Sequence, residues 1–83
     1  DIFNFQFEIL DEVNNIRVVS PNKLNQNMKL ELFNSIGQIQ YSKRLFKGGR
    51  LNDIISVSNF ASGIYYIKIS NEEKSSIQQF VVR

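Results

Sequence analysis

Residues 28–37 have the sequence Met-Lys-Leu-Glu-Leu-Phe-Asn-Ser-Ile-Gly. Met28, Leu30 and Leu32 occupy every second position, and this period of two is typical of a β-strand that buries one face. The residues that follow, from Asn34 to Gly37, favour a tight turn, because Gly37 can adopt a positive φ. The stretch therefore predicts a strand that leads into a hairpin.

The same pattern recurs on both sides of this hairpin. Alternating or short apolar runs are bounded by clusters of Gly, Asn, Ser and Pro, which mark turns, and a corner is expected at Pro21 and Asn22. No segment has the period of a helix. Strands are predicted over residues 3–9, 16–20, 28–33, 38–46, 51–57, 64–70 and 77–82.

Four local features are also predicted. The polar residues 11–15 should form a turn, and residues 64–70, apolar on both faces at first, should form a central strand covered on both sides. In the fourth strand Ile39, Tyr41 and Leu45 should share one face, interrupted by Lys43. Phe60 should be buried within the loop 58–63 and close one end of the core.

Seven short strands spaced about ten to twelve residues apart are typical of a sandwich rather than of alternating strands and helices. We therefore predict an all-β fold, a single seven-stranded antiparallel Ig-like β-sandwich. A length of 83 residues favours one domain spanning residues 1–83. Since the sequence begins Asp-Ile-Phe, without Met or a signal sequence, we expect it to be part of a longer polypeptide.

The composition disfavours catalysis. The absence of Cys and His removes disulfides, thiolate nucleophiles, imidazole triads and the commonest zinc ligands. The adjacent carboxylates at 11–12 and 72–73 are expected in solvated turns, and the serines have no suitable neighbouring base. Asn52 and Asp53 could offer oxygens to Ca²⁺ but lack the pattern of a calcium loop. We predict no enzymatic activity, no cofactor and no metal.

The sequence contains one cluster of basic residues. A net charge of +2 is too small to indicate nucleic acid as a partner. Lys43, Arg44, Lys47 and Arg50 lie within eight residues around Gly48-Gly49, and such a basic tip could contact an anionic surface, for example lipid A phosphate. The alternative is a charged hairpin that protects a sheet edge from pairing.

Two blocks carry a resemblance to a known family. Residues 30–39 have the order strand, turn, Gly, strand, and residues 55–69 have the order strand, small-residue turn, Gly-x-Tyr, strand, followed by an apolar-basic terminus at 79–83. In order, spacing and C-terminal position, residues 14–83 resemble the type IX secretion C-terminal sorting domains of Bacteroidetes. That family normally opens with a Pro-Asn-Pro strand. Here residues 7–11 stand in its place, so residues 1–13 are either a divergent first strand or the remnant of a linker.

The resemblance implies a β-sandwich at the end of a secreted enzyme or adhesin. In that family the outer-membrane translocon recognises the domain, and a sortase-like surface peptidase removes it and can attach the cargo to anionic lipopolysaccharide. The protein would cross the periplasm and reach the cell surface or the medium. By the same resemblance, Gly37 serves the hairpin, Gly63 and Tyr65 set the last turn, and the signal is presented by Lys68, Phe80, Val81, Val82 and Arg83.

The leading hypothesis is a non-catalytic sorting module that presents its final strand to the translocon by edge-strand pairing. The alternative is an accessory Ig-like module that binds carbohydrate or protein through the basic tip and exposed tyrosines. Tyr65 and Tyr66 should face opposite sides, which disfavours a stacking platform for a sugar. A third interpretation is a spacer without a binding role.

Overall fold

The computed structural model describes residues 7–83 and shows seven strands and no helix in that range. The predicted all-β class is confirmed, whereas residues 3–6 of the first predicted strand lie outside the described part. Nor does the described part contain a helix long and apolar enough to span a membrane. The strands are β1 (Glu8–Glu12), β2 (Asn15–Lys23), β3 (Met28–Asn34), β4 (Ile39–Leu45), β5 (Arg50–Ser56), β6 (Gly63–Ser70) and β7 (Ser75–Val82).

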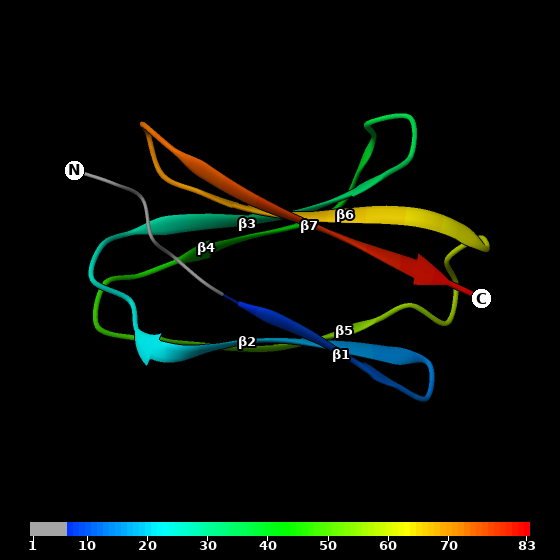
Figure 1. The fold of residues 1–83 in the computed structure, drawn as a ribbon, viewed down its shortest axis with the longest axis horizontal. Coiled ribbons are helices and arrows are strands. Elements are labelled where there is room, and N and C mark those ends of the chain that lie inside the picture. Colours follow the sequence, from blue (N-terminus) through cyan, green and yellow to red (C-terminus); the bar gives the residue numbers. More distant parts are fainter. Residues whose placement is uncertain (1–6) are drawn as a thin grey trace.

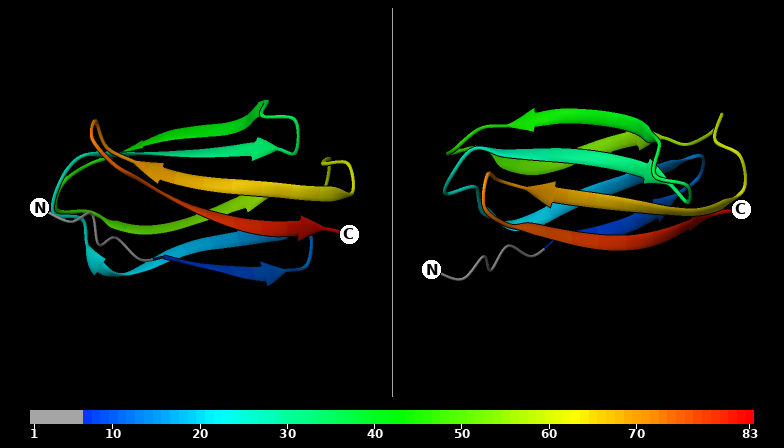
Figure 2. Two further views of the ribbon diagram at one scale, coloured as in Figure 1. Left: turned by 45° about the horizontal axis from the view of Figure 1, so that its top comes forward. Right: turned by 90° about the horizontal axis from the view of Figure 1, so that it is seen from above.

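The strands form two stacked antiparallel sheets (Figures 1 and 2). The three-stranded sheet has the order β1-β2-β5, and the four-stranded sheet has the order β4-β3-β6-β7. The chain changes sheets between β2 and β3, again between β4 and β5, and once more between β5 and β6. This arrangement of three strands over four is that of an Ig-like sandwich.

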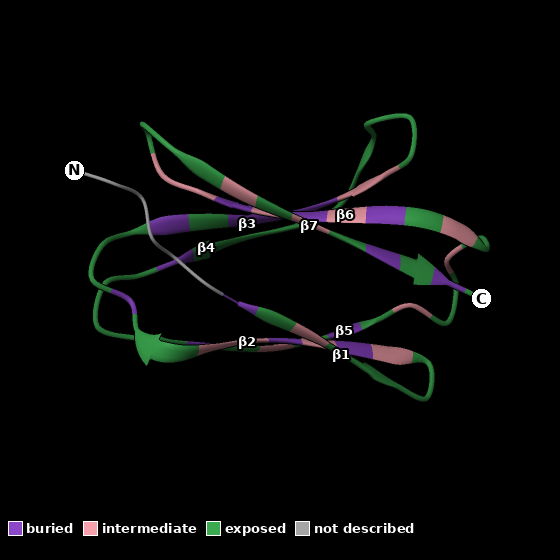
Figure 3. Cartoon of the chain, in the orientation of Figure 1, coloured by how far each residue is buried: buried purple, intermediate pink, exposed green. Residues whose placement is uncertain are grey.

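The core lies between the two sheets, where alternate side chains from both inner faces meet. Figure 3 colours the strands by burial, and along β6 buried residues alternate with half-buried or exposed ones. Most of its fully enclosed members come from the middle strands of each sheet, among them Val18, Leu30, Leu32, Ile67 and Ile69, and Leu51 comes from the edge strand β5. Because a one-residue slip of β3 or β6 would turn these side chains to solvent, burial fixes the register of both strands.

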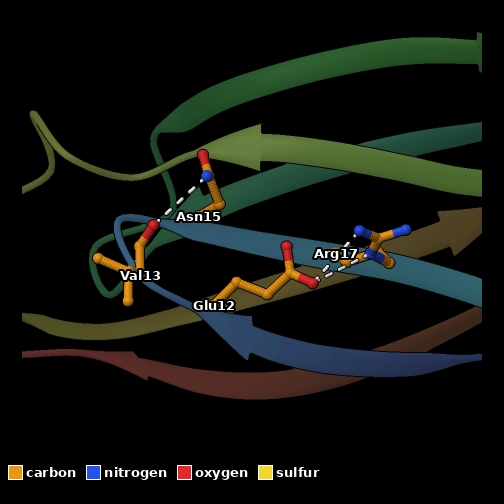
Figure 4. Close-up of polar contacts among 4 residues, drawn as sticks. All are labelled: Glu12, Val13, Asn15 and Arg17. Carbon is orange, nitrogen blue, oxygen red and sulfur yellow. Dashed lines mark hydrogen bonds and ion pairs between the residues drawn. The ribbon is translucent and has the colours of Figure 1, made fainter.

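The first hairpin corrects the prediction of a turn over residues 11–15. Asp11 and Glu12 belong to β1, which pairs with β2 as far as Glu12 opposite Asn15, so the turn is only Val13 and Asn14. Asn14 adopts φ 61°, which Asn tolerates better than most residues. Arg17 of β2 reaches back to the Glu12 carboxylate at 3.3 Å (Figure 4). Cross-strand pairing therefore outweighs the turn preference of the polar residues.

The expected corner at Pro21 and Asn22 is also wrong, because β2 continues to Lys23. Regular pairing with β5 stops at Val19 and resumes where Lys23 lies opposite Arg50. Pro21 sits in this irregular stretch, where its missing N–H removes no ladder hydrogen bond. The residues that indicated a corner instead mark a bulge.

A second bulge overturns the predicted inner face of β4. Leu32 lies opposite Tyr41, but the next residue, Phe33, lies opposite Ile39, so Gln40 is skipped. The shift turns Ile39 outward with Phe33, and Ile39 is exposed. Tyr41, Lys43 and Leu45 remain on the inner side of the strand.

Two expectations about burial need correction. The strand β6 does lie between β3 and β7, but its outer face is not covered, because Ile64 is exposed and Tyr66 is only half-buried. Phe60 packs against the end of the core but is itself half-buried rather than enclosed.

Replacing Ile67 by Ala should lower the free energy of unfolding by about 2–5 kcal/mol, because it opens a cavity in the core. Ile64→Ala, on the outer face of the same strand, should cost about 1 kcal/mol or less. Urea unfolding followed by circular dichroism measures both. Equal losses would contradict the assignment of inner and outer faces.

Candidate functional site

Most of the sorting-motif residues meet at one end of the sandwich. This C-terminal end comprises the β3–β4 turn (35–38), the β5–β6 loop (57–62), the start of β6 and the finish of β7, which lie together in Figure 1. Gly63 lies opposite Val82, and Tyr65 lies opposite Phe80. Lys68 is not part of this group, since it lies farther along β6 opposite Ile77.

The β3–β4 turn is held by the side chain of Asn34. Its Oδ1 accepts hydrogen bonds from the backbone N–H groups of Ile36 (3.2 Å) and Gln38 (2.9 Å), and its Nδ2 donates to Gln38 Oε1. Gly37 has φ +89°, a backbone conformation that most side chains resist. The turn is therefore fixed by its own residues, and it holds Ile36 exposed at its tip.

Tyr65 ties the β5–β6 loop to the core. Its hydroxyl donates a 2.7 Å hydrogen bond to the backbone carbonyl of Ala61, and its ring lies between those of Phe60 and Phe80 at centroid distances of 5.2 and 5.7 Å. A tyrosine at the start of this strand, bonded to the backbone just upstream, is the tyrosine corner of Ig-like sandwiches. The Gly-x-Tyr motif therefore builds the fold.

The motif residues divide by the side of the sheet that they face. Tyr65, Phe80 and Val82 are buried in the core, so their side chains cannot meet a partner while the domain is folded. Val81 and Arg83 are exposed. Only part of the motif is therefore accessible to a partner.

An apolar face, which the motifs did not indicate, lies on the outer side of the four-stranded sheet at the C-terminal end. Its members are adjacent in the ladder: Ile39 opposite Phe33, Phe33 opposite Tyr66, and Ile64 opposite Val81. Ile39, Ile64 and Val81 are exposed, and Phe33 and Tyr66 are half-buried. The sequence signal for this face was the presence of apolar residues at outward strand positions. Ile39 could not be recognised in this way, because the bulge in β4 changes the face on which it lies.

The four cations of the predicted basic tip do not share one surface. Lys43 points inward from β4, and its Nζ lies 3.0 Å from Asp53 Oδ1 on β5, so this ion pair joins the two sheets. Arg44 lies on the opposite face of the strand. Arg50 Nη1 donates to the carbonyl of Pro21 at 3.4 Å, and Lys47 lies in the β4–β5 loop.

The Lys43–Asp53 pair also accounts for the carboxylate considered for calcium. The Asp53 side chain is largely buried, and its Oδ2 has no hydrogen-bond partner. The hydrogen bond to Asp53 raises the pKa of Lys43 above its ordinary value of 10.5. Within residues 7–83 there is no group of three side chains from His, Cys, Asp or Glu that could hold a metal.

Comparison with protein families gives a match over the whole chain. The model of the secretion system C-terminal sorting domain matches residues 1–83. The chain belongs to this family of type IX secretion sorting domains. A comparison with curated proteins finds no match. The match includes residues 1–13, which lie outside the resemblance seen in the sequence. The strand β1 of this segment pairs with β2 along its whole length.

Removing the hydroxyl of the sorting domain's tyrosine corner tests its structural role. Tyr65→Phe should lower the free energy of unfolding by about 0.5–1.5 kcal/mol, because the Ala61 carbonyl loses its donor. Tyr66→Phe is the matched control, since no hydrogen bond of its hydroxyl occurs within the described residues, and it should change stability by less than about 0.5 kcal/mol. Chemical denaturation of both variants measures the two losses, and equal losses would contradict the structural role of the Tyr65 hydroxyl.

The stability contributed by the Lys43–Asp53 ion pair should depend on pH in the alkaline range. Lys43→Met should cost about 1 kcal/mol at neutral pH, near the lower end for a lost partner because the Lys43 side chain is 49% exposed. Since the pKa of Lys43 is raised on folding, the stability from the pair is fully present below pH 10.5 and is lost as the pH rises through the raised value. The stability difference between wild type and Lys43→Met should therefore shrink only above that pH.

Lys47→Met is the control for this pH series, because Lys47 is exposed and forms no ion pair among the described residues. A pH-independent difference for Lys43→Met, or an equal alkaline change for Lys47→Met, would contradict the assignment.

Proposed function

We propose that this chain is a non-catalytic module, one domain over residues 1–83, that directs an upstream cargo in the same polypeptide through the type IX outer-membrane translocon. The cargo crosses the periplasm and reaches the cell surface or the medium. Membership of the sorting-domain family supports export as the role. The observation that carries the proposal further is the convergence of the family's sequence blocks on one end of the sandwich.

In this proposal most motif residues build the fold, and the translocon recognises the exposed residues that the fold positions. Gly37, Gly63 and Tyr65 shape the C-terminal end, while Phe80 and Val82 anchor the last strand in the core. The translocon then recognises what remains outside: the apolar face, which includes Val81, and the neighbouring Arg83. Lys68 lies farther along the same outer face, opposite Glu31 of β3, and would border the recognised surface.

The later steps are part of the same proposal. A sortase-like surface peptidase removes the domain after export, and the cargo is attached to anionic lipopolysaccharide. Direct contact of the domain with an anionic surface would involve Arg44, Lys47 and Arg50, which are exposed and not engaged by carboxylates within residues 7–83. Lys43 is less available, because Asp53 holds it.

The proposal is tested by fusing residues 1–83 to a periplasmic reporter in a Bacteroidetes host that has a working type IX system. The reporter should reach the surface or the medium, and it should stay in the periplasm of a host that lacks the translocon. Deleting residues 80–83 is a poor test of recognition, because it removes Phe80 and Val82 from the core. Retention of the intact fusion in the working host would refute the proposal.

Surface substitutions separate recognition from folding. Ile39→Ser with Ile64→Ser should lower export by about tenfold, which corresponds to a loss of about 1.4 kcal/mol of binding. Ile54→Ser with Leu10→Ser, on the outer face of the other sheet, is the matched control. The exposed fractions are 55% and 42% for Ile39 and Ile64, against 56% and 42% for Ile54 and Leu10. Equal export of both double variants would show that the apolar face is not read.

A further inference from the structure

The four edge strands of the sandwich differ in how they resist pairing with another chain. Edges of native sheets are normally blocked by charges, bulges or short length. The strand β1 has five residues, three of them acidic, and β4 carries the inward Lys43 and a bulge. The strand β5 carries Arg50 and the inward Asp53 beside the β2 bulge.

The fourth edge, β7, has none of these protections. It is eight residues long, Ser-Ser-Ile-Gln-Gln-Phe-Val-Val, with no charge, Pro or Gly, and it pairs with β6 without a register shift. Among the described residues no strand pairs with its other side. Figure 2 shows β7 in red at one margin of its sheet. Its outward side chains Ile77 and Val81 are exposed.

Among the described residues, the backbone groups of β7 that do not face β6 belong to alternate residues. In the β6–β7 turn the N–H of Asn71 donates to the carbonyl of Lys74 at 2.9 Å, so this pair is hydrogen-bonded. Hydrogen-bonded and non-hydrogen-bonded pairs alternate along an antiparallel ladder. The backbone groups of Ile77, Gln79 and Val81 therefore point away from β6, toward the open edge.

We propose that a second copy of this chain pairs with β7 in an antiparallel arrangement, about a twofold axis at Gln79. Two four-stranded sheets then become one eight-stranded sheet. Gln79 lies opposite Gln79 of the second copy, and Ile77 lies opposite Val81 of the second copy. The residues with free backbone groups are those that exchange hydrogen bonds in this register.

Side-chain matching favours this register over its neighbours. It brings together Ile77 and Val81, the two exposed apolar side chains of the strand, once on each side of the axis. It also places Arg83 opposite Ser75 and beside Glu73 of the β6–β7 turn, so that opposite charges lie at diagonal positions. Moving the axis to Gln78 would place Val81 opposite Ser75 and leave Ile77 opposite Gln79.

The dimer should be weak and reversible, because one edge of eight residues buries less than the surface typical of a stable interface. The pairing extends the sheet sideways and leaves its outer face open, so Val81 is the one member of the apolar face that contacts the second copy. The two proposals share Val81 but are tested separately, because the dimer can form or fail in the purified chain whatever the result of the export assay.

Sedimentation equilibrium of the 83-residue chain over a range of concentrations tests the proposal, together with amide NMR spectra. We expect a monomer–dimer equilibrium and concentration-dependent shifts centred on Ile77, Gln79 and Val81. Gln79→Pro removes an outward N–H from each copy and should weaken the dimer by about tenfold or more. Gln79→Thr keeps that N–H and should leave the dissociation constant nearly unchanged.

A charge pair tests the register without proline. Ile77→Glu with Val81→Glu places like charges opposite each other across the axis and should give a monomer. Ile77→Glu with Val81→Lys places opposite charges there and should restore the dimer, with a dissociation constant that rises with salt. The two double variants differ only in the residue that replaces Val81, and their circular dichroism and thermal unfolding show whether both are folded.

A chain that stays monomeric at millimolar concentration would overturn the proposal. So would a dimer that is unaffected by Gln79→Pro and by the paired glutamates, because it would use another surface. Disruption by the paired glutamates without rescue by the variant that combines Ile77→Glu with Val81→Lys would exclude this register.

Discussion

The packing of alternate side chains from β3 and β6 against β2 is the constraint on which the rest of the structure depends. Leu30, Leu32, Ile67 and Ile69 leave almost no surface exposed, so each of these strands has one register and one inner face. Everything on the outer side follows from that choice. Once Ile67 points inward, Ile64 and Tyr66 must lie on the outer face together, beside Phe33 of the neighbouring strand.

This constraint explains why the residues that make the chain recognisable as a sorting domain are mostly not available to a partner. The Gly-x-Tyr block sets a tyrosine corner, the Asn34–Gly37 block sets a turn, and two of the last three strand residues lie in the core. Such positions allow few residue types because the fold requires them. A sequence motif of this kind identifies the domain but does not locate its contact surface, which must be sought among exposed neighbours.

The sequence predicted the elements better than their details. The number of strands and the all-β class followed from the period of two in the sequence. This period depends only on which face of each strand is buried. The errors at Asp11, Pro21 and Ile39 have a common cause, because each concerns how one strand is paired with another. A bulge such as that at Gln40 changes the face of every residue on one side of it. The four cations of the predicted basic tip are divided between surfaces for a related reason, since neighbours in a strand, such as Lys43 and Arg44, lie on opposite faces.

The placement of charge shows how this small sandwich controls its own margins. Lys43 and Asp53 lie on edge strands of different sheets, and their contact closes the side of the sandwich where β4 and β5 meet. A charge that faces inward at an edge also obstructs an incoming strand, so the pair serves both closure and protection. The opposite margin has no such pair among the described residues: β1 is shielded by its carboxylates, but β7 has only uncharged side chains. Since the net charge of the chain is small, general repulsion cannot substitute for local protection. Of the four described edges, the strand that carries the C-terminal motif is therefore the one that the fold leaves able to accept a partner.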